Sequence, residues 1–212
     1  MADIFVAISE AIQIGDQDKV AKLAEEALTK GIPALDILDN AMVPGIETTG
    51  EKFKSGEFFL PEILICARAM NRGIEVLTPH FPKEGAHKRG TVVIGTIEGD
   101  MHDIGKNLVR MMLECSGFRI VDLGVDAPPS SFVEAAHDQK ADIIAVSALL
   151  TTTMVNIPKV IEALKQSGIG DKVKVMIGGA PVTRAYADQI GAEGFAEDCT
   201  AAVDEAKRLV AV

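Results

Sequence analysis

The sequence is poor in the features that mark disulfide-bonded and membrane-spanning proteins. It has three cysteines, an odd number, and they lie far apart in the chain. Cys66, Cys115 and Cys199 fit neither a disulfide framework nor a CxxC metal site, so we expect buried or partly buried thiols with a structural role. No apolar run reaches the ~18 residues that a membrane-spanning helix needs, so no such helix is expected.

The sequence also lacks a basic segment. Asp and Glu outnumber Lys and Arg by 31 to 21, and the formal net charge is −10 at pH 7. Phosphate backbones and anionic membranes would be repelled, so neither nucleic acid nor a membrane is an expected partner. The beginning of the chain, MADIFVAISEAIQIGDQDK, lacks the basic region, apolar core and cleavage site of a secretory leader. We expect a cytoplasmic protein whose partners are proteins or small molecules.

Hydrophobic residues make up 48% of the 212 residues, enough for a substantial core. In the first part of the chain they recur at helical spacing, without runs rich in Val and Ile. The pattern predicts a bundle of four helices, at 2–14, 17–30, 33–54 and 60–79. Asp16 is expected to cap the second helix and Gly31 to end it, with Pro33 and Pro61 where helices begin.

A linker is expected at 79–90, PHFPKEGAHKRG, because two prolines, two glycines and mixed charges are typical of linkers. It would separate a helical domain, residues 1–85, from a second domain, residues 90–212. His80 and His87 lie in this segment, and we expect them to be exposed to solvent.

In the second domain, strand-like and helical patterns alternate. The strand-like runs are apolar enough for burial on both faces, at 91–97, 118–123, 141–149, 172–179 and 194–198. Helical patterns follow them, at 104–115, 130–139, 154–167, 182–190 and 199–210. The alternation predicts an α/β fold with a doubly wound, Rossmann- or flavodoxin-like parallel sheet of five strands. Right-handed crossovers bring the carboxyl ends of parallel strands to one edge, where a ligand site is expected.

The first loop at that edge, GDMHDIG at 99–105, places one histidine between two acids. A carboxylate that accepts one ring proton of a histidine fixes the tautomer and makes the other ring nitrogen a better metal ligand. Asp100 or Asp103 could serve His102 in this way. Either acid could instead only cap the following helix, so the loop alone leaves both interpretations open.

Two further loops close the third and fourth strands. SALLTTT at 147–153 has four hydroxyls, which could line a polar slot for a ligand or satisfy the backbone at the next helix start. GGAP at 178–181 lacks large side chains, so a ligand could lie against its backbone, although a tight turn would have the same composition.

Together the three loops resemble the cobalamin-binding signature of methionine synthase and of the corrinoid proteins of methyltransferase systems. The signature has Asp-x-His-x-x-Gly, Ser-x-Leu and Gly-Gly at the ends of the first, third and fourth strands. The matching residues are Asp100, His102, Gly105, Ser147, Leu149, Gly178 and Gly179. The resemblance extends over nearly the whole chain, because in that family a four-helix cap precedes the α/β domain.

The resemblance implies a cobalamin or related corrinoid, bound base-off and His-on: the nucleotide tail leaves cobalt, and His102 becomes the lower ligand. Asp100 would accept the other ring proton, and Thr153 would complete a proton relay. Other residues expected at the corrinoid or its tail are Gly99, Met101, Asp103, Ile104, Gly105, Ser147, Leu149, Thr151, Gly178, Gly179, Ala180, Gly194 and Phe195. Phe59 and Leu60 would cover the upper face of the corrin or belong to the bundle core.

The family implies a methyl carrier and not a complete enzyme, because no residues remain for the barrel of a methyltransferase. Co(I) would accept a methyl group from a partner methyltransferase bound to a methylamine, a betaine, methanol or a methoxylated aromatic. Methyl-Co(III) would then deliver it to a second methyltransferase, with tetrahydrofolate or a thiol such as coenzyme M as acceptor. A reductive activation protein would be a further partner.

Three alternatives remain open. A flavodoxin-like flavin protein shares the fold class, although the loop GTIEGDMHDIG lacks both phosphate-binding glycine spacings. A subunit of a cobalamin-dependent isomerase usually lacks the cap, and a cobalamin-responsive regulator should carry a DNA-binding module, which is not visible. A divalent-metal site of His102, Asp100 and Asp103 would leave the other loops unexplained. His137 is expected on the surface of a helix.

Overall fold

The computed structural model describes residues 2–81 and 89–211. They belong to two compact units, one up to residue 88 and one from residue 89, except that Cys115–Gly117 is grouped with the first. Most of the predicted linker, including His87, lies outside the described residues. Of the helices in the described part of the chain, none is both long and apolar enough to cross a membrane.

The first unit is helical. Its elements are α1 (Ala2–Gln13), α2 (Gln17–Thr29), α3 (Ala34–Ile37), the π-helical turn η1 (Leu38–Met42), α4 (Val43–Lys54), α5 (Leu60–Leu77) and the 3-10 turn η2 (Thr78–His80). The four predicted helices are confirmed, and the third contains the π-helical turn. Pro44 is the second residue after this turn; because proline has no N–H to donate, it interrupts the regular hydrogen-bond ladder of the helix there.

Local signals define where these helices begin and end. The side chain of Asp16 accepts a hydrogen bond at 3.0 Å from a backbone N–H in the first turn of α2, which it caps as predicted. The same helix ends before Gly31, whose φ of +78° is a left-handed conformation that glycine adopts readily. At the start of α5, Glu62 accepts a hydrogen bond from the N–H of Phe59 at 3.0 Å.

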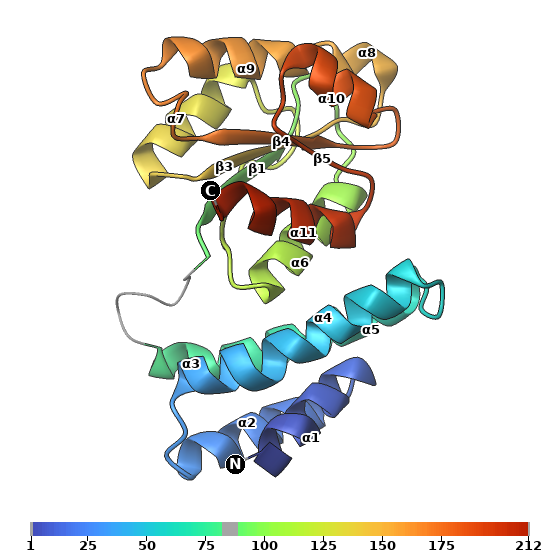
Figure 1. Ribbon diagram of the computed structural model, residues 1–212, viewed down its shortest axis with the longest axis vertical. Helices are drawn as coiled ribbons and strands as arrows, with labels where there is room; N and C mark the ends of the chain where they lie inside the picture. Colours follow the sequence, from blue (N-terminus) through green and yellow to red (C-terminus); the bar gives the residue numbers. More distant parts are fainter. Residues whose placement is uncertain (1, 82–88, 212) are drawn as a thin grey trace. The chain divides into compact units, whose positions relative to one another are not determined.

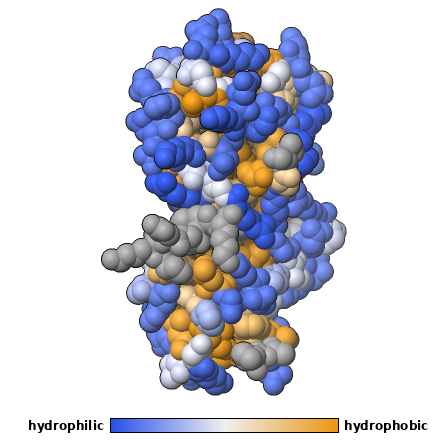
Figure 2. Space-filling model, turned by 60° about the vertical axis from the view of Figure 1, so that its left-hand side comes forward, coloured by the Kyte–Doolittle hydropathy of each residue, from blue (hydrophilic) through white to orange (hydrophobic). Residues whose placement is uncertain are grey.

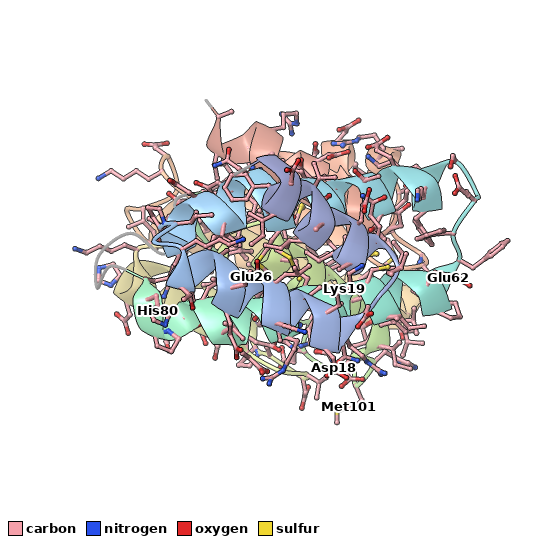
Figure 3. The ribbon with its side chains drawn as sticks, turned by 90° about the horizontal axis from the view of Figure 1, so that it is seen from below. Asp18, Lys19, Glu26, Glu62, His80 and Met101 are labelled. Atoms are coloured by element: carbon pink, nitrogen blue, oxygen red, sulfur yellow. The ribbon has the colours of Figure 1, made fainter. Side chains whose placement is uncertain are left out.

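The outer surface of the helical unit is mixed. Asp18, Lys19 and Glu26 are exposed along α2, on the side that faces the viewer in Figure 3. Apolar residues also reach the surface, as the hydrophobic areas of this unit in Figure 2 show. The exposed large apolar residues among its described residues are Val6, Ile14, Phe59, Leu60 and Ile65. Because Phe59 and Leu60 are 67% and 39% exposed, their interpretation as bundle core is wrong.

The second unit alternates strands and helices. Its strands are β1 (Thr91–Thr96), β2 (Arg119–Asp122), β3 (Ile143–Ser147), β4 (Lys174–Gly178) and β5 (Gly194–Ala196). Its helices are α6 (Ile104–Cys115), α7 (Pro129–Gln139), α8 (Thr151–Met154), α9 (Ile157–Gln166), α10 (Arg184–Ile190) and α11 (Cys199–Val210). All neighbouring strands are parallel, in the order β2-β1-β3-β4-β5. The predicted five-stranded, doubly wound fold is confirmed; the short helix α8 was not predicted.

Helices cover both faces of this sheet. Figure 1 shows α7, α9 and α10 on one face and α6 and α11 on the other. The apolar core on the first side joins Val93 of β1, Ile144 of β3 and Val175 of β4 to Phe132 of α7 and Ile161 of α9. Because the central strands are buried on both faces, their sequences are almost continuously apolar.

The carboxyl ends of the central strands form the edge that the sequence indicated. Thr96, Ser147 and Gly178 are paired in register across β1, β3 and β4. After β1 the chain turns to α6 on one face of the sheet, and after β3 it turns to α8 and α9 on the opposite face (Figure 1). This divergence is the topological switch point at which open α/β sheets bind ligands.

The isolated thiols, His80 and His137 lie as expected. The three cysteines are buried. Burial raises the pKa of the Cys66 thiol, and burial together with the nearby charge of Asp198 raises the pKa of Cys199 to about 11. Such thiols stay protonated and unreactive near neutral pH. His80 is exposed, and the side chain of His137 is 69% exposed.

We predict that Gly179→Ala destabilises the protein far more than Gly168→Ala. Both glycines have positive φ, +124° and +77°, but a Cβ at Gly179 would lie 1.8 Å from the carbonyl oxygen of Ala148, whereas nothing lies within 4 Å of a Cβ at Gly168. Gly168→Ala should cost about 1–2 kcal/mol through backbone strain alone. Gly179→Ala should lower the free energy of unfolding by more than this. Urea unfolding followed by circular dichroism would measure both losses, and equal losses for the two variants would contradict the close packing at Gly179.

Candidate functional site

The carboxylate of Asp100 joins the loops that follow β1 and β3. This side chain is fully buried. Its Oδ1 accepts hydrogen bonds from the backbone N–H of His102 at 3.1 Å and from the ring Nδ1 at 2.7 Å. Its Oδ2 accepts hydrogen bonds from the Thr153 hydroxyl at 2.7 Å and from the N–H groups of Leu149 and Leu150 at 2.8 and 3.3 Å. One side chain therefore fixes two loops that are far apart in the sequence.

These contacts keep Asp100 ionised. Burial alone would raise the pKa of Asp100, but the hydrogen bonds from Thr153, Leu149 and His102 outweigh burial and hold this pKa well below its usual range. An ionised carboxylate can only accept hydrogen bonds, so the neutral ring of His102 carries its proton on Nδ1 and its lone pair on Nε2.

The other edge of the His102 ring is open. The side chain is 52% exposed, and no residue in the described parts of the chain forms a hydrogen bond with Nε2. An exposed nitrogen with a free lone pair, on a ring held by a buried carboxylate, has the properties of a metal ligand.

Thr153, the third residue of the predicted relay, lies in α8 and is buried. Besides its contact with Asp100, its hydroxyl lies 3.0 Å from the carbonyl oxygen of Leu150. Its methyl group faces Gly99, with Cγ2 3.5 Å from where a Cβ at that glycine would lie. The methyl group therefore packs beside the relay and leaves the hydroxyl in contact with the carboxylate.

The surface near His102 is apolar. Among the described residues of this unit, the exposed large apolar side chains are Met101, Ile104, Leu149, Leu150 and Val155. All of them belong to the segments that follow β1 and β3, which the Asp100 carboxylate joins. Figure 3 shows Met101 extending away from the ribbon. Exposed apolar side chains gathered at one edge mark a binding surface for a large ligand with an apolar face.

The other predicted residues of these two loops lie at the same edge. Ser147 ends β3 and is half-buried, and Thr151 begins α8 and is exposed. A Cβ at Gly105 would have open space within 4 Å. Asp103 accepts a hydrogen bond from the side-chain amide of Asn107 at 3.0 Å.

Of the two acids that flank the histidine, only Asp100 contacts its ring. In the described residues, no group of three or more His, Cys, Asp and Glu side chains is arranged to hold a metal ion. The alternative of a divalent-metal site built from His102, Asp100 and Asp103 is therefore not supported.

The glycine loop after β4 is required by packing within the protein. A Cβ at Gly178 would lie 2.9 Å from the carbonyl oxygen of Ala196, and one at Gly179 would overlap the carbonyl oxygen of Ala148. Larger residues are therefore excluded at both positions whether or not a ligand lies against them. Ala180 follows and is exposed.

Gly194 and Phe195 lie in β5, the strand that pairs with β4. Gly194 is buried, and a Cβ there would lie 2.9 Å from Leu209 and 3.1 Å from Met176. Phe195 is half-buried against the apolar core, with the guanidinium of Arg184 5.5 Å from its ring centre. Both residues have partners inside the protein, and their contact with the far end of the nucleotide tail stays a prediction.

Comparison with known proteins decides the family. A model described as a B12 binding domain matches residues 90–206, and a second model with the same description matches residues 4–78. This chain belongs to the B12-binding corrinoid proteins. It binds a cobalamin-type corrinoid, and the flavodoxin-like flavin alternative is dropped.

Individual relatives of this corrinoid protein match along its whole length. Trimethylamine corrinoid protein 1 of Methanosarcina acetivorans is 46% identical over 98% of this chain and 97% of the relative. Among solved structures, a cobalamin-binding protein from Desulfitobacterium hafniense has a TM-score of 0.83 at 30% identity, covering 99% of this chain and 100% of that one. A chain of the methanol:cobalamin methyltransferase complex from Methanosarcina barkeri has a TM-score of 0.87 at 31% identity. The match covers 99% of this chain and 80% of that one.

The sequence did not single out Thr96 and Asp126, which also hold the histidine loop of this corrinoid protein. The Thr96 hydroxyl donates to the carbonyl of His102 at 2.9 Å, and the Asp126 carboxylate accepts from the N–H of Gly99 at 2.7 Å. A polar residue at the end of an apolar strand was a usable signal for Thr96. No sequence signal pointed to Asp126, because its contact arises only when two loops lie side by side.

We predict that Asp100→Asn destabilises the protein without corrinoid by about 2–4 kcal/mol, because an amide cannot accept all the hydrogen bonds that converge on the carboxylate. The folded-state pKa of Asp100 is lowered. Its contribution to stability is therefore fully present above its unfolded pKa of about 3.9 and is lost as the pH falls toward the folded-state pKa. Below about pH 4, the unfolding free energy of the variant should fall less steeply than that of the wild type.

Urea unfolding at several pH values would measure this difference. Asp171→Asn, at an exposed carboxylate, is the matched control and should leave both the stability and its pH dependence unchanged. A variant at residue 100 that was as stable as this control would show that the buried network does not hold the two loops.

Proposed function

We propose that this protein holds its corrinoid base-off with His102 as the lower cobalt ligand, and that it carries methyl groups between two methyltransferases. The observation that carries the proposal is the half-exposed ring of His102, whose Nδ1 donates to a buried and ionised carboxylate. Cobalt supplies the reactivity that accepts and releases the methyl group, and the protein supplies ligation, orientation and access.

The residues at the edge of the sheet fit a corrinoid. The macrocycle is broad and largely apolar, and exposed apolar side chains gather in the two loops around His102, including Met101, Ile104 and Leu149. The open space beside Gly105 leaves room over the first turn of α6. Ser147 and Thr151, with the small residues of the loop after β4, would line the channel for the nucleotide tail.

Asp100 and Thr153 would control how strongly His102 binds. With Asp100 ionised, the hydrogen bond at Nδ1 increases the electron density that Nε2 can donate to cobalt. Without a metal bound, Nε2 of His102 could take up a proton, and the nearby carboxylate would stabilise the resulting charge. The hydroxyl of Thr153 stabilises the carboxylate in turn. These residues thereby couple ligation to proton uptake without touching the methyl group.

Methylated amines are the donor class that the comparisons favour. The relative named for trimethylamine is 46% identical to this chain, whereas the chain matched in the methanol:cobalamin methyltransferase complex is 31% identical. We therefore propose an amine-specific methyltransferase as the first partner. The second would transfer the methyl group to tetrahydrofolate or to a thiol such as coenzyme M, and a reductive protein would restore cobalt after accidental oxidation.

The role of His102 predicts a spectroscopic result. After loading with hydroxocobalamin, desalting and reduction to Co(II), the electron paramagnetic resonance spectrum should show coupling to one axial nitrogen, and nitrogen-15 labelling of histidine should change that coupling. His102→Ala should abolish the coupling. His137→Ala, at an exposed histidine, is the control and should retain it.

If the desalted wild type retained no cobalt, corrinoid binding itself would be refuted. If it retained cobalt but histidine labelling left the spectrum unchanged, only the His-on part of the proposal would be lost.

The carrier role predicts a stoichiometric reaction. The loaded and reduced protein, mixed with trimethylamine and a methyltransferase specific for it, should release dimethylamine in an amount equal to the cobalt present. Each transfer breaks one carbon–nitrogen bond and moves one methyl group to cobalt. Release only in the parallel reaction with methanol and its methyltransferase would overturn the donor class, and no transfer from either donor would favour the isomerase or regulator alternative.

A further inference from the structure

The backbone of His102 is held at both of its polar groups. Its N–H donates to Asp100 Oδ1 at 3.1 Å, and its carbonyl accepts from the Thr96 hydroxyl at 2.9 Å. Thr96 is fully buried at the end of β1. Its position is itself fixed, because its N–H donates to Gly124 at 3.0 Å and its carbonyl accepts from Ala127 at 2.9 Å. The bond to His102 therefore starts from a rigid point of the sheet.

Asp126 holds the loop just before the histidine. Its carboxylate accepts from the N–H of Gly99 at 2.7 Å, and its own N–H donates to the carbonyl of Asp100 at 3.0 Å. Asp126 has a φ of +53°, a left-handed conformation that few residues other than glycine adopt at low cost. In this conformation Asp126 makes both hydrogen bonds with the segment that precedes the histidine.

The loop is also fixed after the histidine. Lys106 is buried and donates to both carboxylate oxygens of Asp122 at 2.7 Å and to the side chain of Asn107 at 3.0 Å. The amide of Asn107 donates in turn to Asp103 at 3.0 Å. The first turn of α6 is thereby tied to the end of β2.

The side chain of His102 contrasts with this rigid backbone. Its ring is 52% exposed and has one hydrogen-bonded contact, with Asp100, among the described residues. The hydrogen bonds therefore restrain the backbone of the histidine more than its ring.

We infer that Thr96 is a positioning residue for the cobalt ligand: by holding the carbonyl of His102, it keeps the backbone in place while the imidazole leaves cobalt and returns. This inference rests on the proposed His-on function and deepens it. A ligand that returns from a fixed backbone needs no loop reorganisation, so the bound state is favoured over the free one.

Thr49 provides a control that separates a positioning role of Thr96 from a merely structural one. Thr49, in α4 of the helical unit, is also fully buried, and its hydroxyl donates to the carbonyl of Gly45 at 3.0 Å. Thr49→Val removes a buried hydroxyl from a carbonyl just as Thr96→Val does, with the same change of shape. Both variants should lose similar stability, but only Thr96→Val should affect His102. Thr96→Ser keeps the hydroxyl and should restore the wild-type behaviour.

The first measurement uses the full-length protein without corrinoid. Nitrogen-15 spectra of the histidine rings at one fixed pH report on the Nδ1 proton of His102, and the chain has only four histidines to assign. Thr96→Val should weaken or broaden the signal of the Nδ1 hydrogen bond to Asp100. Thr96→Ser and Thr49→Val should match the wild type.

The second measurement uses the corrinoid-loaded Co(II) protein at the same pH. The ratio of His-on to His-off cobalt, read from the axial nitrogen coupling, should fall about three- to tenfold in Thr96→Val, the change produced by losing one hydrogen bond of ordinary strength. Unchanged ring spectra and an unchanged ratio in Thr96→Val would overturn the positioning role. An altered ring spectrum without corrinoid, in a protein whose cobalt never shows histidine coupling, would uphold the backbone clamp and refute the proposed ligation instead.

Discussion

The geometry of the site depends on one buried negative charge. An isolated carboxylate in the interior would be costly, and Asp100 is stable there only because donors from two loops converge on it. The loops are therefore not free to move independently, since withdrawing either one would leave a charge without enough donors. The same charge selects the tautomer of His102. A single electrostatic requirement thus sets the shape of the edge and the chemical character of its exposed nitrogen.

The parallel sheet brings together the two loops whose donors converge on Asp100. Parallel pairing places the ends of β1 and β3 side by side, and the chain then diverges to opposite faces of the sheet. The polar network and the exposed apolar side chains both belong to the segments that follow these two strands. In the proposed function, affinity for the large ligand and control of its metal would fall to different residues, Met101 and Leu149 for the first and Asp100 for the second.

The secondary structure was largely predictable from the sequence, because buried parallel strands give apolar runs and the helices between them show a regular period. The relay residues were identifiable from their resemblance to a family. The helix α8 was missed because it has only four residues and is held by Asp100, a residue distant in the chain, through the N–H groups of Leu149 and Leu150 just before it and the hydroxyl of Thr153 within it. The two-point contact of Asp126 and the burial of Gly194 arise from tertiary packing, which one-dimensional patterns do not record. Phe59 and Leu60 could belong to the bundle core or cover the corrin, and only the structure shows that they are exposed.

The close approach of Gly178 and Gly179 to neighbouring carbonyl groups has an evolutionary consequence. Mutation at either glycine is opposed by the fold itself, so the pair would persist in a descendant that had lost its cofactor. The imidazole of His102 has no such protection, since its ring is half-exposed and supports no core packing. In diverging lineages, the glycine pair would thus trace common ancestry, whereas replacement of the histidine would be the early sign that the proposed metal ligation had been abandoned.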